Sequence, residues 1–265
     1  MAQLDNRYAQ AGGISRPATG VMDEGLRAYM LRVYNYMAAG VALTGLVSLF
    51  LYSIATTVDP AMAAMIGGKA AKVGKVYLTD VGATLYMSPL KWEIMFAPLA
   101  MCLLLGFGAN RLSVGGTQLA FWVFAALVGA SLSVIFLVYT QTSIARIFFI
   151  TSAAFGALSL WAYTTKKDLS GWGTFLFMGL IGIIIASIVN IWLASPALMF
   201  AVSAIGVLVF AGLTAYDTQM IKDGYYDVQH DGTATSKAAV MGAFALYTDF
   251  INLFQSLLSL FGDRE

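Results

Sequence analysis

Two aspartates in the C-terminal part of this 265-residue chain have the strongest potential for chemistry. Asp249 interrupts the apolar segment 238–260 near its middle, and Asp217 follows the preceding apolar segment, 197–216. A charge at the centre of a bilayer costs at least ~2.5–3.5 kcal/mol, so carboxylates inside apolar spans are functional candidates. Two carboxylates at close range do not both ionise cheaply, and we expect such a pair to share a proton. The alternative for Asp217 is a solvated position at headgroup level.

Polar side chains continue along one face of the helix expected around Asp249. Asn252, Ser256 and Ser259 follow Asp249 at i+3, i+7 and i+10, so all four share one helix face. This polar stripe either belongs to a functional path or forms a hydrogen-bonded seam with another helix. Both interpretations are open at this point. A hydrogen-bonded seam does not require a carboxylate, however, so the presence of Asp249 favours a functional role for that residue.

The remaining residues exclude most other chemistry. His230 is the only histidine and Cys102 the only cysteine, which excludes histidine-based metal sites, catalytic triads and thiolate clusters. The chain has no Gly-rich nucleotide-binding motif. Asp217 lacks the Gly-x-Gly-Asp context of intramembrane aspartyl proteases. We therefore expect no enzyme and no cofactor, and the sequence identifies no metal ligands.

The composition indicates that lipid is part of the solvent. Hydrophobic residues make up 59% of the chain and charged residues only 11%, whereas soluble domains are about half apolar and a quarter charged. The formal net charge of +1 gives no basic excess for nucleic acid. The chain is therefore predicted to be a multi-pass protein of the cell membrane, in contact with the lipid bilayer and not with nucleic acid.

Apolar segments predict an all-α polytopic membrane protein with seven transmembrane helices in a bundle, since each segment approaches the ~20 residues that cross a bilayer. The predicted spans are 33–58, 92–109, 119–139, 147–163, 172–193, 197–216 and 238–260. Ser195-Pro196 separates two of them, because proline cannot donate to the helix ladder. We expect a flexible polar tail over 1–30, a transmembrane domain over 31–265, and soluble connections over 59–91 and 222–237.

Basic residues in the connections set the expected orientation. Lysines and arginines are somewhat more numerous on the side of the N-terminus than on the other side. Since cytoplasmic connections carry an excess of these residues, the bias favours a cytoplasmic N-terminus. An odd number of spans then places the C-terminus outside.

Two segments extend the argument from composition to a family. The segments 214–221 (TAYDTQMI) and 246–254 (LYTDFINLF) resemble the C-terminal signature of the Bax inhibitor-1 (transmembrane Bax inhibitor motif) family. Residues 166–170 (KKDLS) resemble the family's connection between spans four and five. The resemblance implies a bacterial member with seven helices, located in the inner membrane if the organism is Gram-negative.

The resemblance also implies a function. It implies that Asp217 and Asp249 form a proton-sharing dyad that gates a pH-sensitive leak for calcium or other cations. The family uses an arginine near the end of the second helix as a latch on the dyad, and order along the chain makes Arg111 the candidate. The alternative is an interaction protein that modulates a membrane-anchored quality-control protease or a stress response through residues 1–25, without transport.

Overall fold

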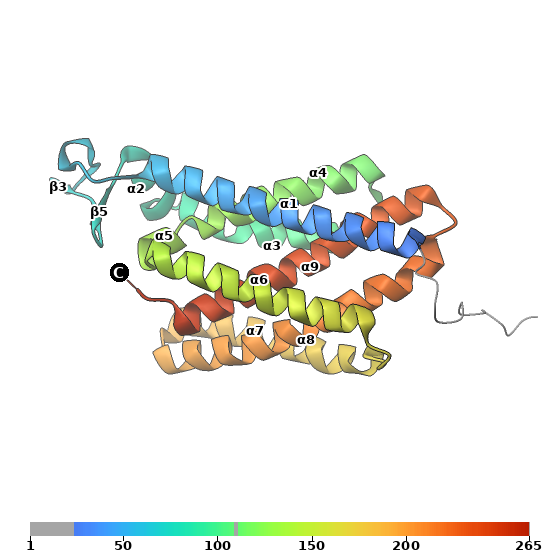
Figure 1. Cartoon of the computed structure of the whole chain (residues 1–265). Helices are drawn as coiled ribbons and strands as arrows, with labels where there is room; N and C mark the ends of the chain where they lie inside the picture. The colour runs from blue at the N-terminus through green and yellow to red at the C-terminus, as the bar shows by residue number, and fades with distance from the viewer. Residues whose placement is uncertain (1–23, 109–110, 265) are drawn as a thin grey trace, which may run out of the picture.

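The computed structural model describes residues 24–108 and 111–264, which form a bundle of long helices with a small β region at one end (Figure 1). Seven spans in this part of the chain are long and apolar enough to cross a membrane. They are α1 (Glu24–Ala55), α3 (Leu90–Gly108), α4 (Val114–Leu132) with α5 (Ile135–Val138), α6 (Gln141–Thr164), η3 (Ser170–Trp172) with α7 (Gly173–Leu193), α8 (Pro196–Val228) and α9 (Gly232–Phe261). The predicted all-α polytopic membrane fold is confirmed.

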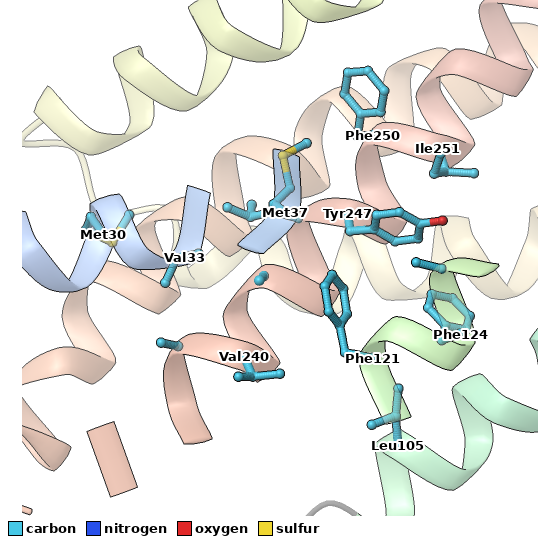
Figure 2. Packing of buried hydrophobic residues seen from close by; sticks show 14 of the residues in the cluster. Met30, Val33, Met37, Leu105, Phe121, Phe124, Val240, Tyr247, Phe250 and Ile251 are labelled. Carbon is cyan, nitrogen blue, oxygen red and sulfur yellow. The ribbon is translucent and has the colours of Figure 1, made fainter. Parts of the chain in front are cut away.

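Helix α9 occupies the centre of the bundle (Figure 1). It packs most extensively against α8 and also against α1, α6 and α4. Figure 2 shows Tyr247 and Phe250 of α9 among buried side chains of neighbouring helices, with Phe121 and Phe124 of α4 beside them. By contrast, α3 and α7 present large apolar side chains outward, such as Phe107 and Trp192, as expected where lipid is the solvent.

The connection between α1 and α3 is folded rather than irregular. It contains β1 (Thr56–Thr57), η1 (Pro60–Met62), β2 (Met65–Ile66), β3 (Lys69–Ala70), β4 (Lys72–Val73), β5 (Val76–Leu78) and α2 (Asp80–Met87). Strands β1, β5 and β4 form an antiparallel sheet in that order, and β2 pairs with β3. Leu78 is fully buried and packs with Ala64 and Ala71. This small cluster fixes the connection against the end of the bundle.

The predicted break before Pro196 is confirmed. Ala194 adopts a left-handed conformation (φ 46°) and ends α7, while Ser195 caps α8 by accepting a hydrogen bond from the Leu198 amide. The Asn190 side chain accepts a further hydrogen bond from the Ser195 amide, 2.9 Å away. These contacts satisfy backbone groups that helix ends leave open.

Two predicted boundaries are wrong. Helix α8 continues to Val228, so most of the expected 222–237 connection is helical, and Asp231 caps α9 through the Thr233 and Ala234 amides. Helix α1 includes residues 24–30, which were expected in the tail, because Leu26, Tyr29 and Met30 are buried in the core. Residues 1–23 of that predicted tail lie outside the described residues.

Candidate functional site

The two aspartates predicted from the sequence are brought together at the α8–α9 contact. Asp249 is buried, with 4% of its surface exposed, because α9 runs through the middle of the bundle. Asp217 is partly buried and lies inside α8, eleven residues (~16 Å) before its end at Val228. Asp217 therefore faces the neighbouring helix α9, where it meets Asp249.

The carboxyl groups of Asp217 and Asp249 lie close enough to interact directly. Two ionised carboxylates are acceptors only, so a hydrogen bond between them requires a proton on one of the two. The Oδ2 atom of Asp249 is buried and has no hydrogen-bond partner in the described part of the chain. Neither aspartate forms a salt bridge with a basic residue among residues 24–108 and 111–264. The close approach of the two carboxyl groups is the arrangement that the predicted proton sharing requires.

The polar stripe on α9 is a seam against α8. Ser259 accepts a hydrogen bond from Ser203 of α8 at 2.8 Å. Ser256 lies so close to Gly206 of α8 that a Cβ there would sit 2.6 Å from its Oγ. Asn252 donates to the Thr248 carbonyl of its own helix at 2.8 Å. The structure therefore favours the seam for Ser256 and Ser259, of the two interpretations that the sequence left open.

The candidate latch is not in contact with the dyad. Arg111 lies in the connection between α3 and α4, where its side chain is exposed. Within the residues that the structure describes, it forms no hydrogen bond or salt bridge. That connection is instead held by Lys237 of α9, whose Nζ donates to the Leu112 carbonyl at 2.9 Å. Arg111 was predicted as the latch from the order of residues along the chain, and that order does not determine its distance from the two aspartates in the folded protein.

A row of hydroxyl groups beside Asp217 was not predicted. Thr218 donates to the Thr214 carbonyl at 2.7 Å, so its oxygen is free to accept from Ser159 of α6 at 2.8 Å. Ser159 in turn accepts from the Tyr34 hydroxyl of α1 at 2.6 Å. This row joins α1, α6 and α8 next to the dyad. The only sequence signal was that Thr214 and Thr218 flank Asp217 at helical spacing.

A second buried polar contact lies two residues before Asp249. The Tyr247 hydroxyl lies 2.6 Å from Thr44 Oγ1, and Thr44 donates to the Ala125 carbonyl at 2.8 Å. Because Thr44 uses its hydrogen on Ala125, Tyr247 must be the donor to Thr44. Figure 2 shows this hydroxyl among aromatic rings of the core. The contact ties α9 to α1 and α4 beside the dyad.

A salt bridge lies at one end of the bundle, away from the two aspartates. Arg146 forms a salt bridge of 2.9 Å with Asp263, and both side chains are more than half exposed. Across the described ranges, no three or more His, Cys, Asp or Glu residues are grouped so that they could hold a metal ion. The site thus consists of the carboxyl pair, the α8–α9 seam and the hydroxyl row.

Comparisons with known proteins cover nearly the whole chain. The family described as "Inhibitor of apoptosis-promoting Bax1" matches residues 26–265. The chain is 42% identical to an uncharacterized protein of Caulobacter vibrioides over 265 residues, which is all of both chains. It is 46% identical to an uncharacterized protein of Rickettsia prowazekii, covering 92% of each chain. It is 41% identical to the inner membrane protein YbhL of Escherichia coli, covering 98% of this chain and all of YbhL.

Proposed function

Since this chain belongs to the Bax inhibitor-1 family and is a multi-pass membrane protein, we propose that it is a pH-sensitive leak channel for calcium and other cations. The observation that carries the proposal is the close approach of the carboxyl groups of Asp217 and Asp249, which α8 and α9 bring together inside the bundle. The pair lies where α8 meets the central helix, so a change in its charge acts on the contact that organises the bundle.

The physical basis is a switch between attraction and repulsion. With one shared proton, the two carboxyl groups join α8 to α9 through a charge-assisted hydrogen bond. Without that proton both carboxylates are charged, and two unit negative charges at ~4 Å repel by about 4 kcal/mol at an effective dielectric constant of 20. A free energy of this size exceeds that of a typical hydrogen bond in the seam. Titration of the pair therefore has enough energy to shift one helix against the other.

The proposal is tested with purified protein in calcium-loaded liposomes. The variant Asp217→Asn/Asp249→Asn keeps groups able to hydrogen-bond at both positions but has no proton to lose. We expect calcium efflux from wild-type liposomes to change between acidic and alkaline pH, and efflux from the double variant to be independent of pH. If the double variant keeps both the flux and its pH response, the dyad is not the gate.

A matched control is available on the same helix. Asp223 is an exposed aspartate of α8, six residues beyond Asp217 and outside the seam. Asp223→Asn removes an equal charge without touching the pair, so it should leave the pH response of the efflux unchanged. Loss of the response in this control would assign the effect to surface charge.

The alternative function, modulation of a membrane-anchored protease, was assigned to residues 1–25, of which 1–23 lie outside the described residues.

A further inference from the structure

A long groove separates α1 from α6 on the lipid-facing side of the bundle. Its larger part has a volume of about 640 Å³, and a second part of about 330 Å³ continues beyond it. Val41, Phe148 and Phe250 line both parts, so the two are continuous. We call this feature the α1–α6 groove. Its larger part falls within the ~300–1,000 Å³ typical of sites for small ligands.

The groove is long and narrow. Its larger part follows α1 from Arg27 to Ala42, which is ~22 Å at a rise of 1.5 Å per residue. One leaflet of a bilayer contributes about half of the ~30 Å hydrocarbon core. The length and narrowness of the groove therefore fit one extended acyl chain.

Polar groups of the groove are gathered near the N-terminal end of α1. Arg27, Tyr34, Ser159 and Tyr163 lie there, while the rest of the larger part is almost wholly apolar. Arg27 is exposed and, within the described ranges, forms no hydrogen bond or salt bridge, even with Glu24 one turn earlier. This end of the groove thus offers an unpaired guanidinium.

A second cation stands beside the same end. Lys222 of α8 donates to the Tyr163 carbonyl at 2.8 Å and lies 5.4 Å from the centroid of the Tyr163 ring. Guanidinium and ammonium groups recognise phosphate oxygens, and the planar guanidinium can bind two of them at once. Basic pockets between helices at the level of lipid headgroups select anionic phospholipids for this reason.

We propose that the α1–α6 groove binds one acyl chain of an anionic phospholipid, whose phosphate is bound by Arg27. The lipid comes from the leaflet at the N-terminal end of α1. The apolar length of the groove holds the chain, and the cationic end selects the headgroup. This assignment concerns binding and stands independently of the proposed leak.

The groove can be filled by substitution from within. A Cβ added at Gly156, which lines the groove, would meet no atom within 4 Å. Gly156→Leu therefore places a side chain in the space of the acyl chain without a clash. Gly182 of α7 is equally open and lies outside the groove, so Gly182→Leu is the matched control. Ala38→Phe fills the groove from the α1 side and replaces Gly156→Leu if that variant does not fold.

The experiment uses the full-length protein in phosphatidylcholine vesicles containing phosphatidylglycerol with a photoreactive acyl chain. We expect crosslinks mapped by mass spectrometry to concentrate on the groove, and Gly156→Leu to reduce them about tenfold, the change that 1.4 kcal/mol of lost binding produces. Gly182→Leu should leave them unchanged. Crosslinks spread evenly over α3 and α7, or unaffected by both groove-filling variants, would overturn the proposal.

A charge variant tests the headgroup. Arg27→Gln should abolish the preference for the phosphatidylglycerol probe over a phosphatidylcholine probe with the same acyl chain. Lys166→Gln removes one positive charge from the exposed α6–α7 connection and should preserve that preference. Equal labelling by the two probes in wild-type protein would contradict the role of Arg27. Added inorganic phosphate should have no effect, since it lacks the chain that the groove binds.

Discussion

At the centre of the bundle, the Tyr247 hydroxyl is surrounded by aromatic side chains and reaches one polar partner, Thr44. Tyr247 is fully buried, and Thr44 in turn donates a hydrogen bond to the Ala125 carbonyl. A buried donor without a partner costs about 1–3 kcal/mol, whereas a hydrogen bond lost together with its donor costs about 0.5–1.5 kcal/mol. The two ends of this contact should therefore respond differently to substitution.

We expect Thr44→Val to destabilise the protein more than Tyr247→Phe does. The valine leaves the Tyr247 hydroxyl and the Ala125 carbonyl buried without this partner, which should lower the free energy of unfolding by about 1–3 kcal/mol. The phenylalanine removes the donor itself and leaves the Thr44–Ala125 hydrogen bond in place, at about 1 kcal/mol. Thermal unfolding of the purified variants in detergent measures the difference as a lower Tm for Thr44→Val. Equal Tm values, or the reverse order, would show that the hydroxyl has another partner.

The aspartates and the hydroxyl row differ in how far the sequence could predict them. Asp249 was detectable because a carboxylate inside an apolar segment is costly, and Asp217 because the segment around it resembles a family signature. Tyr34, Ser159 and Thr218 are separated by 125 and 59 positions, and hydroxyl groups are inexpensive in membranes, where they also bond to their own helix. Neither a high cost of insertion into the membrane nor a characteristic spacing in the sequence therefore identified these three residues as functional candidates. Arg111 is the opposite case. Its position in the sequence suggested a latch, but that position did not predict whether its side chain contacts the dyad.

At the scale of helices, the contact between α1 and α4 has no room for a side chain at Gly129. A Cβ at Gly129 would lie 2.6 Å from the Thr44 carbonyl oxygen and 2.9 Å from the Val47 Cβ. These neighbours belong to the opposing helix, and one of them is backbone, so they cannot move aside cheaply. Gly156 of α6, by contrast, faces the open groove. Glycines in membrane helices therefore serve different purposes in this bundle.

This difference predicts opposite effects of the same substitution. Gly129→Ala should force α1 and α4 apart and destabilise the protein by about 1–3 kcal/mol, the usual cost of overpacking. Gly156→Ala should be neutral or stabilise by up to about 1 kcal/mol, since alanine favours the helix. Comparison of the two unfolding midpoints in one detergent tests this prediction. A Gly129→Ala variant as stable as the wild type would mean that α1 and α4 can move apart without a loss of stability.

The helix boundaries show what hydropathy can and cannot predict. All seven spans were identified, because apolar length is a direct requirement of the bilayer. The end of α8 was missed, since polar residues such as Lys222 and Asp223 mark where a chain leaves lipid and not where a helix ends. Nothing in that stretch stops a helix until the turn before Asp231, whose side chain caps α9. The start of α1 was missed for the same reason.

At the scale of the whole molecule, seven spans place the start of α1 and the C-terminal end of α9 at opposite ends of the bundle (Figure 1). The strands and the C-terminal residues lie together at one end. There, the Thr140 amide donates to the Asp263 carbonyl, and Arg146 pairs with Asp263. The connection between α8 and α9 lies at the other end, near the start of α1, where Arg32 donates to Ser236. Which end faces the cytoplasm is a prediction from the basic residues alone.

Cysteine labelling tests that orientation, because Cys102 is the only cysteine and Cys102→Ser gives a background without thiols. Lys69, in β3, and His230, between α8 and α9, are both exposed and lie at opposite ends. With a cytoplasmic N-terminus, a membrane-impermeant maleimide should label Lys69→Cys in intact cells and His230→Cys only after permeabilisation. The reverse pattern would place the N-terminus outside, and labelling of both sites from the same side would contradict seven crossings.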